Sequence, residues 1–245
     1  MMYYLKPLGM AGLLLFLSAC NKEVKPNELH FATFAEYPPF EYIEQGEIKG
    51  FDIDLARLLA KKLGKTAVFD NIQFSTILPA ISSGQDDAAI ATMTITPLRQ
   101  KNFDFTLPYY FEGMAAVYKT TAPVTTVAAL HGKKVAAQLG SVMDLWLRDH
   151  LNAKDMITFN SNNQAVEALV AGHVDLVLMD GQQAAVYSRK HEGLAYNTIM
   201  KAKQGYGIAL KKGSPLTKEM NDALKKLEKE GVMKKLQSKW LGGAL

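Results

Sequence analysis

The sequence predicts an α/β protein built as two lobes, each layered around a largely parallel sheet. Strand-like and helix-like segments alternate from Leu29 onward, which is the pattern that such layers produce. A β-α-β-α-β order occurs twice, and the Thr/Pro-rich stretch 120–126 separates the two occurrences. The repetition of one pattern on both sides of a turn-rich segment favours two lobes over one large sheet.

The first unit begins with a strand over residues 29–34. After Gly50, apolar residues at i, i+4, i+7, i+8 and i+12 share one helix face: Phe51, Leu55, Leu58, Leu59 and Leu63. Gly64 is placed to end this helix. The unit is completed by a strand over 66–69, a helix over 75–83 ended by Gly84, and a strand over 87–93.

The second unit repeats this order with a strand over 134–138 and a helix opened by Ser141, which has Asp144 at the capping-box position. It continues with a strand over 156–159, a helix over 163–171, a strand over 174–179 and a helix over 182–190. The chain then returns with a strand over 206–210. We expect Ser214 to cap a helix with Pro215 at its first position, and a last amphipathic helix over 232–240.

The N-terminus has the layout of a bacterial lipoprotein signal. Lys6 precedes the apolar run 8–17, which leads into Leu17-Ser18-Ala19-Cys20. We therefore expect residues 1–19 to be a signal peptide, Cys20 to carry a diacylglycerol, and residues 20–28 to be a lipid tether. A buried strand with an incidental cysteine is the alternative. The run is too short to span a bilayer as a helix, and no later stretch reaches the length that a transmembrane helix needs.

Charge and cysteine content exclude several classes of function. The net charge is +4 and becomes +3 when residues 1–19 and their single lysine, Lys6, are removed. Acidic and basic residues are interspersed, so a nucleic-acid partner has no basic patch to bind. Cys20 is the only cysteine. Its lipidation would leave no thiol for a disulfide, a nucleophile or a thiolate metal site.

Two charged residues lie where open α/β sheets bind ligands, at the carboxyl ends of strands. Arg99 falls in the first turn of a short helix that Thr96 caps and Pro97 begins. A cation is disfavoured beside the positive end of a helix unless an anion lies there too, and a ligand carboxylate would suit. A solvated arginine is the alternative. Asp180 ends a very apolar strand and could bind an ammonium group, or simply cap the next helix.

Two aromatic residues, Tyr37 and Phe74, each follow a strand and could enclose an aliphatic or guanidinium side chain. Core packing is the alternative for each ring.

Four motifs occur in order: Tyr37-Pro38-Pro39-Phe40-Glu41, Gly50-Phe51-Asp52-Ile53-Asp54-Leu55, Phe74-Ser75-Thr76-Ile77-Leu78-Pro79 and Thr94-Ile95-Thr96-Pro97-Leu98-Arg99. Together with the Asp180 segment and the terminal Lys239-Trp240, this series resembles the polar amino acid-binding proteins of ABC importers. It is similar to the glutamine, histidine and lysine/arginine/ornithine binders and especially to the arginine binders. The likeness extends from about Leu29 to Trp240.

The resemblance implies a two-lobed type II periplasmic-binding-protein fold, the Venus-flytrap fold, with two hinge strands. Lobe 1 would comprise residues 29–109 and 209–245, and lobe 2 residues 114–203. Residues 110–113 and 204–208 would form the hinge.

The resemblance also implies the ligand contacts. Arg99 would bind the ligand α-carboxylate and Asp180 its α-ammonium, with Tyr37 and Phe74 on either side of the ligand side chain. The remaining expected contacts are Ala91, Thr92, Thr94, Gln138 and Ser141.

Two residues depart from the family pattern. Phe34 stands where many relatives have an acid or amide, and Glu36, two residues further along, would compensate by facing the same side. Val142 stands where many relatives have a threonine, which leaves backbone N–H groups to bind the carboxylate there.

The expected function is capture of a free amino acid, with arginine favoured over glutamine, lysine, ornithine and histidine, and its delivery to an ABC importer permease. The protein would act as a monomer, lipid-anchored in the periplasm or on the outer face of the membrane, without a cofactor or metal. An enzyme on the same fold, such as a cyclohexadienyl dehydratase, is disfavoured because the five histidines show no metal spacing and no G-x-S-x-G motif occurs. A ligand-sensing protein is the other alternative.

Overall fold

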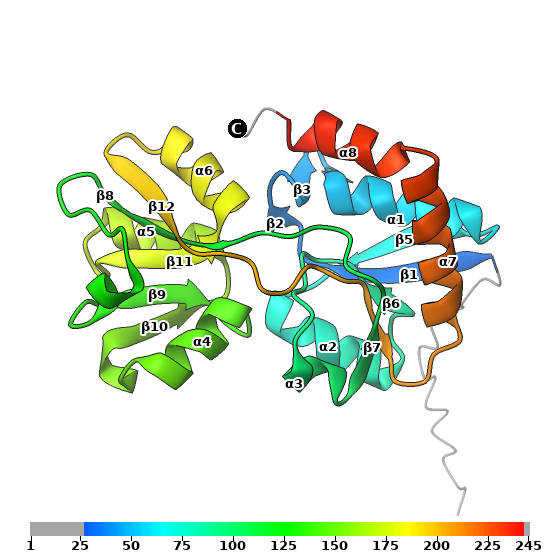
Figure 1. Ribbon diagram of the computed structural model, residues 1–245, viewed down its shortest axis with the longest axis horizontal. Coiled ribbons are helices and arrows are strands. Elements are labelled where there is room, and N and C mark those ends of the chain that lie inside the picture. The colour runs from blue at the N-terminus through cyan, green and yellow to red at the C-terminus, as the bar shows by residue number, and fades with distance from the viewer. Residues whose placement is uncertain (1–26, 243–245) are drawn as a thin grey trace, which may run out of the picture.

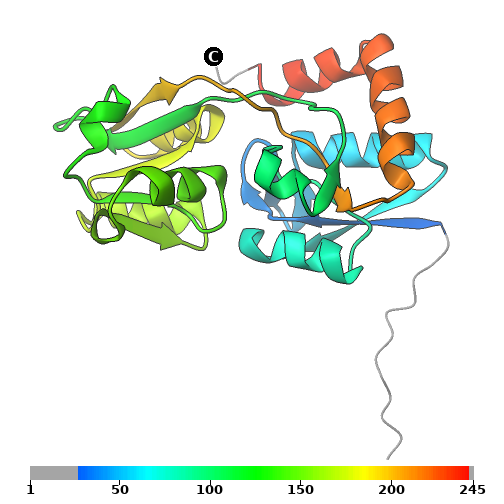
Figure 2. The same ribbon diagram turned by 60° about the horizontal axis from the view of Figure 1, so that its bottom comes forward.

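The computed structural model describes residues 27–242 as two α/β lobes joined by two extended crossings that lie side by side (Figures 1 and 2). The lobe 1 sheet has the strand order β5-β1-β6-β13-β7. Its strands are β1 (Glu28–Thr33), β5 (Thr66–Asn71), β6 (Ala88–Ala89), β7 (Phe103–Phe105) and β13 (Ala209–Lys211). β1 pairs in parallel with β5 and β6, whereas β13 is antiparallel to its neighbours β6 and β7.

Helices cover both faces of this sheet (Figure 1). They are α1 (Phe51–Lys62), α2 (Phe74–Ser83), α3 (Pro97–Gln100), α7 (Leu216–Lys229) and α8 (Val232–Trp240). On α1 the predicted apolar face is confirmed, because Phe51, Leu55 and Leu59 are fully buried in the core. The helix ends at Lys62, and Gly64 then adopts the left-handed φ of 70° that glycine accepts without steric cost.

The lobe 2 sheet has the order β10-β9-β11-β8-β12. Its strands are β8 (Met114–Lys119), β9 (Val135–Gln138), β10 (Met156–Phe159), β11 (Leu176–Asp180) and β12 (Leu194–Met200). Its helices are α4 (Val142–His150), α5 (Asn162–Val170) and α6 (Gly181–Lys190), with short 3₁₀ turns at Val127–Leu130 and Ala153–Asp155. The parallel strands β9, β10 and β11 carry the predicted repeat. The antiparallel strands β8 and β12, which continue from the crossings, were not predicted.

Lobe 1 also contains a small antiparallel sheet that the sequence pattern did not indicate. It consists of β2 (Glu36–Tyr37), β3 (Glu41–Glu44) and β4 (Glu47–Lys49). The β3–β4 hairpin turns through Gln45 and Gly46, which both have the positive φ that a two-residue type I′ turn requires. Strands this short show no clear alternation of apolar residues, and this is why they were missed.

Three local predictions were wrong. The strand expected over 87–93 pairs only at Ala88–Ala89, because the chain turns away at Thr92, where φ is 47°. The strand expected over 206–210 is a bridge at Tyr206 followed by β13. Ser214 does not cap α7 with its side chain; its backbone carbonyl accepts the N–H of Thr217 at 3.2 Å instead.

The two crossings contact one another directly. The N–H of Tyr206 donates to the carbonyl of Tyr110 at 2.8 Å. A Cβ atom at Gly205 would lie 2.6 Å from Pro108 Cβ and 2.7 Å from the Tyr110 carbonyl oxygen, so this close approach requires glycine. Within residues 27–242, none of the helices combines the length and apolar character needed to cross a membrane.

Candidate functional site

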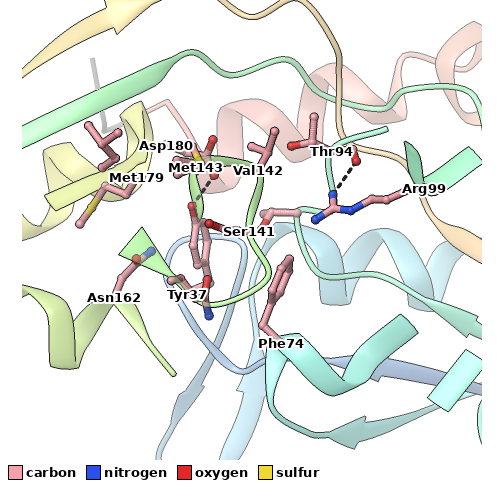
Figure 3. A pocket seen from close by; sticks show the side chains of 13 residues that line it. Tyr37, Phe74, Thr94, Arg99, Ser141, Val142, Met143, Asn162, Met179 and Asp180 are labelled. Atoms are coloured by element: carbon pink, nitrogen blue, oxygen red, sulfur yellow. Dashed lines mark hydrogen bonds between the residues drawn. The ribbon is translucent and has the colours of Figure 1, made fainter. Parts of the chain in front are cut away.

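A small cavity lies between the lobes, and residues of both lobes line it (Figure 3). Nine of the twelve residues expected to bind a ligand lie here: Tyr37, Phe74, Thr92, Thr94, Arg99, Gln138, Ser141, Val142 and Asp180. The enclosed space is only about 20 Å³, room for about one water molecule. A larger ligand therefore requires the side chains that reach across the cleft to move.

Arg99 lies in α3, where its position is fixed by the start of the helix. The hydroxyl of Thr96 caps α3 by accepting the N–H of Arg99 at 3.2 Å, as predicted, and Pro97 is the first helical residue. The Arg99 guanidinium is buried and donates to the carbonyl of Thr94 at 2.6 Å and, across the cleft, to the carbonyl of Gly140 at 3.0 Å. Its Cζ lies 6.0 Å from the centre of the Phe74 ring. These contacts rule out the solvated alternative.

No carboxylate pairs with Arg99 among the residues that the structure describes. Burial lowers the pKa of Arg99 to about 10, and attraction to Asp180 acts in the opposite direction. The guanidinium thus stays charged at neutral pH, and its hydrogen bonds within the described part of the chain go to neutral carbonyl groups. A buried cation with this geometry favours an anionic ligand group, and its planar fork fits a carboxylate.

Asp180 faces the cavity from the opposite lobe, at the end of β11. Its backbone begins α6, but its side chain makes no capping hydrogen bond, so the helix-cap alternative is wrong. The side chain instead accepts a hydrogen bond from the Tyr37 hydroxyl across the cleft (Figure 3). Burial raises the pKa of Asp180 to about 7, while hydrogen bonding from Tyr37 and attraction to Arg99 oppose the rise. An arriving ammonium group would favour the ionised form.

Lobe 1 supplies the other polar wall of the cavity. Thr92 is buried and its N–H donates to Asp52 Oδ2 at 2.9 Å. Thr94 forms a backbone bridge with Tyr206 in the second crossing. Phe74 is the first residue of α2, and Tyr37 ends β2. Both rings line the cavity and both also pack into cores, so the core-packing alternative is confirmed, while enclosure of a ligand side chain stays a prediction.

Lobe 2 presents the start of α4 to the cavity. Ser141 caps α4 as predicted, because its hydroxyl accepts the N–H of Asp144 at 3.1 Å. The return bond of the capping box is displaced by one residue: Asp144 Oδ2 accepts the N–H of Gly140, at 2.9 Å. Val142 is the first residue of α4 and lines the cavity together with Gln138 at the end of β9.

Three expected residues lie outside the cavity. Phe34 and Ala91 are buried in the lobe 1 core beside Phe74. Glu36 is exposed and accepts a hydrogen bond from Asn163 Nδ2 at 3.3 Å, which joins the two lobes. The expectation that Phe34 and Glu36 face the same side is wrong, because the N–H of Glu36 donates to the Phe34 carbonyl at 2.8 Å and this tight turn ends the extended geometry.

Four cavity residues were missed: Met143, Asn162, Leu178 and Met179. Asn162 follows the cap residue Ser161 shortly after β10, so the strand-end rule that identified Arg99 and Asp180 could have found it. The three apolar residues belong to patterns that predict core packing and carry no separate signal.

The chain matches the family of bacterial extracellular solute-binding proteins, family 3, over residues 29–243. It is 32% identical over 227 residues to the L-cystine-binding protein TcyJ of Escherichia coli (strain K12), covering 91% of this chain and 85% of that protein. It is also 32% identical over 237 residues to the arginine-binding extracellular protein ArtP of Bacillus subtilis (strain 168), covering 93% of each.

Solved structures agree with these sequence matches. An ancestral arginine-binding protein bound to arginine superimposes with a TM-score of 0.83 at 36% identity, covering 87% of this chain and 98% of that one. An ancestral arginine-binding protein bound to glutamine gives a TM-score of 0.85 at 35% identity, covering 89% of this chain and 100% of that one.

Proposed function

We propose, because the chain belongs to family 3 of the bacterial extracellular solute-binding proteins, that it captures one free amino acid between its lobes and delivers it to an ABC importer. The observation that carries the proposal is the pair of buried, opposite charges that face the cavity from different lobes. Within residues 27–242 Arg99 donates to two neutral carbonyl groups and pairs with no carboxylate, and Asp180 accepts a hydrogen bond from the Tyr37 hydroxyl and pairs with no cation. The family and the relatives reported above are solute-binding proteins and not enzymes.

A zwitterionic amino acid matches this arrangement. Its carboxylate would bind the Arg99 guanidinium beside the start of α4, and its ammonium would bind Asp180. The Tyr37 hydroxyl donates to Asp180 Oδ2, and we expect it to move aside when the ammonium binds. Each protein charge then exchanges a neutral partner for an oppositely charged one, which makes a stronger hydrogen bond.

The same ligand would hold the lobes together. We assign residues 29–109 and 209–245 to lobe 1, residues 114–203 to lobe 2, and residues 110–113 and 204–208 to the hinge. Few direct hydrogen bonds close the cleft: beside the Arg99, Tyr37 and Glu36 contacts, Gln183 Nε2 donates to the Pro38 carbonyl at 3.1 Å. A ligand that both lobes bind favours the closed state, because its contacts with the second lobe form only when the lobes close.

Arginine is the ligand that the side-chain environment supports best, with glutamine, lysine, ornithine and histidine as the alternatives. A guanidinium can stack between Tyr37 and Phe74, which both line the cavity. A buried guanidinium also needs a carboxylate. Glu36, at the cleft mouth, is the candidate, and it would have to exchange its Asn163 contact for the ligand. Glutamine needs no such acid.

We further propose that the protein is a monomer tethered to a membrane through Cys20, in the periplasm or on the outer face, where it meets its permease. Cys20 and the signal peptide lie outside the described residues, so this part rests on the Leu17-Ser18-Ala19-Cys20 sequence.

A thermal-shift screen with the twenty amino acids, ornithine and cystine tests the function. A ligand that binds only the folded state raises its melting temperature. We expect the largest rise with arginine, and no rise when the same ligand meets Arg99→Ala. If no amino acid raises the melting temperature of the wild type at millimolar concentration, the proposal fails.

A further inference from the structure

Two carboxyl groups lie buried behind the cavity wall without a cation. Glu41 belongs to β3 and is 1% exposed, and Asp52 in the first turn of α1 is fully buried. Neither forms an ion pair with a lysine, arginine or histidine within residues 27–242. Two buried negative charges so close together would be very unfavourable.

The hydrogen bonds around the two groups are unequal. Asp52 Oδ2 accepts the N–H of Thr92 at 2.9 Å and the hydroxyl of Tyr109 at 2.8 Å. Glu41 Oε1 is only 3.5 Å from the Thr92 hydroxyl. The other oxygens, Glu41 Oε2 and Asp52 Oδ1, accept nothing from an N–H or hydroxyl group of the described residues. Both carboxyl groups lie against Thr92, which brings the two acids together, and a hydrogen bond with Asp52 is among the causes that raise the pKa of Glu41.

A hydrogen bond between two carboxyl groups exists only when one of them carries a proton. Asp52 accepts hydrogen bonds from two donors, which stabilise its ionised form more than that of Glu41. The proton therefore resides on Glu41. Burial, then the Asp52 charge, raises the pKa of Glu41 well above its usual value, and burial raises the pKa of Asp52 to about 7. The other titratable groups that face the pair, Tyr37, Tyr109 and Asp180, supply no positive charge.

Thr92 needs such support. Its φ of 47° is a left-handed conformation that is rare for a β-branched residue and strains the backbone. Its N–H is held by Asp52, and its side chain lines the ligand cavity. The same Asp52 oxygen binds Tyr109, which immediately precedes the first crossing. The acid pair therefore joins the cavity wall to the start of the hinge region.

We propose that Glu41 and Asp52 share one buried proton, and that the singly protonated pair is a positioning device that holds the strained Thr92 in the ligand cavity and ties it to Tyr109. Its effect on ligand binding rests on the proposed function. The shared proton itself does not.

The proton is tested without ligand, by infrared spectroscopy in D₂O at pH 8. We expect the carbonyl stretch of a protonated carboxyl group in the wild type and its loss in Glu41→Gln, whose amide donates to Asp52 as the acid does. Asp180→Asn is the matched control and should keep the band. A wild-type spectrum without the band, or a band that persists in Glu41→Gln, overturns the shared proton.

Thermal unfolding between pH 5 and pH 9 gives an independent readout. The unfolded chain releases the Glu41 proton above about pH 4.3, whereas the folded protein retains it, so the wild type should lose stability as the pH rises. Glu41→Gln lacks this proton, so its melting temperature should rise relative to that of the wild type as the pH increases. A difference in melting temperature that stays constant across the range contradicts the proposal.

Positioning is tested by hydrogen exchange of the Thr92 amide and by calorimetry with arginine and with glutamine. Asp52→Ala should accelerate exchange of the Thr92 amide and lower the affinity for the amino acid probe at least tenfold. Glu41→Gln should keep both the exchange rate and the affinity within about threefold of the wild type. Slow Thr92 exchange in a folded Asp52→Ala refutes the positioning role. If Asp52→Ala does not fold, the positioning role is refuted instead when the Thr92 amide of Glu41→Gln loses its protection against hydrogen exchange. If neither probe binds the wild type, the proposed function fails while the infrared and exchange results still decide the inference.

Discussion

Replacing Arg99 with alanine is expected to weaken amino acid binding far more than it weakens the fold. In the structure Arg99 is 6% exposed and touches the cavity without an ion-pair partner in the described part of the chain. The substitution leaves a bound carboxylate buried without its counter-ion, which costs about 3–5 kcal/mol. At about 1.4 kcal/mol for each factor of ten, affinity should fall roughly a hundred- to several-thousand-fold.

The stability of the unliganded protein should change much less than the affinity. Arg99 donates to two backbone carbonyls, of Thr94 and Gly140, and the loss of these hydrogen bonds is partly offset because a buried cation without an ion-pair partner is removed as well. Arg57→Ala is the matched control, because Arg57 is 52% exposed and pairs with Asp54 on α1, away from the cavity. Arg99→Lys keeps the charge without the planar fork and should fall between the wild type and Arg99→Ala.

Isothermal titration calorimetry with arginine measures these affinities, and thermal unfolding without ligand measures the stabilities. A loss of less than fivefold in a folded Arg99→Ala would show that the guanidinium does not hold the carboxylate. A comparable loss in Arg57→Ala would show that the effect is not specific to the cavity.

Three further predictions concern Asp180, Glu36 and Cys20. Asp180 has a pKa of about 7 in the free protein and must lose its proton to bind an ammonium, so the affinity measured by calorimetry should rise from pH 5 to about pH 7 and then level off. Asp180→Asn should bind weakly and show no such rise. An affinity of the wild type that does not depend on pH would contradict this. Glu36→Gln should lose arginine affinity and keep glutamine affinity, whereas equal losses for both ligands would exclude Glu36 as the partner of a guanidinium. Cys20→Ala should appear in the soluble fraction or remain unprocessed in cells, and intact-mass analysis that finds an unmodified mature N-terminus at another residue would rule out the lipid anchor.

Arg99 and Asp180 could be assigned to the cavity from the sequence because the chemistry of each residue conflicts with its local structure. Arg99 stands at a helix start that disfavours cations, and Asp180 ends a strand that is otherwise apolar. Such conflicts are visible in a sequence because they depend only on neighbouring residues and on the strand-end rule. Both side chains face the same cavity in the structure.

The features that were missed depend on contacts between distant segments. A single tight turn separates the faces of Phe34 and Glu36, and no local pattern announces it. Glu41 and Asp52 lie in stretches that give no sign of two buried acids, because their burial results from packing between β3, α1 and the Thr92 segment. Strand β8 pairs with β11 and β12, which follow much later in the sequence, so its place in the sheet depends on contacts between distant segments.

A crystal structure of the protein grown with arginine tests the proposed binding mode most directly. The account predicts an arginine between the lobes, with its carboxylate within hydrogen-bonding distance of the Arg99 guanidinium, its ammonium on Asp180 in place of the Tyr37 hydroxyl, and its side chain between Tyr37 and Phe74. An amino acid bound elsewhere, or bound with its ammonium turned away from Asp180, would contradict it.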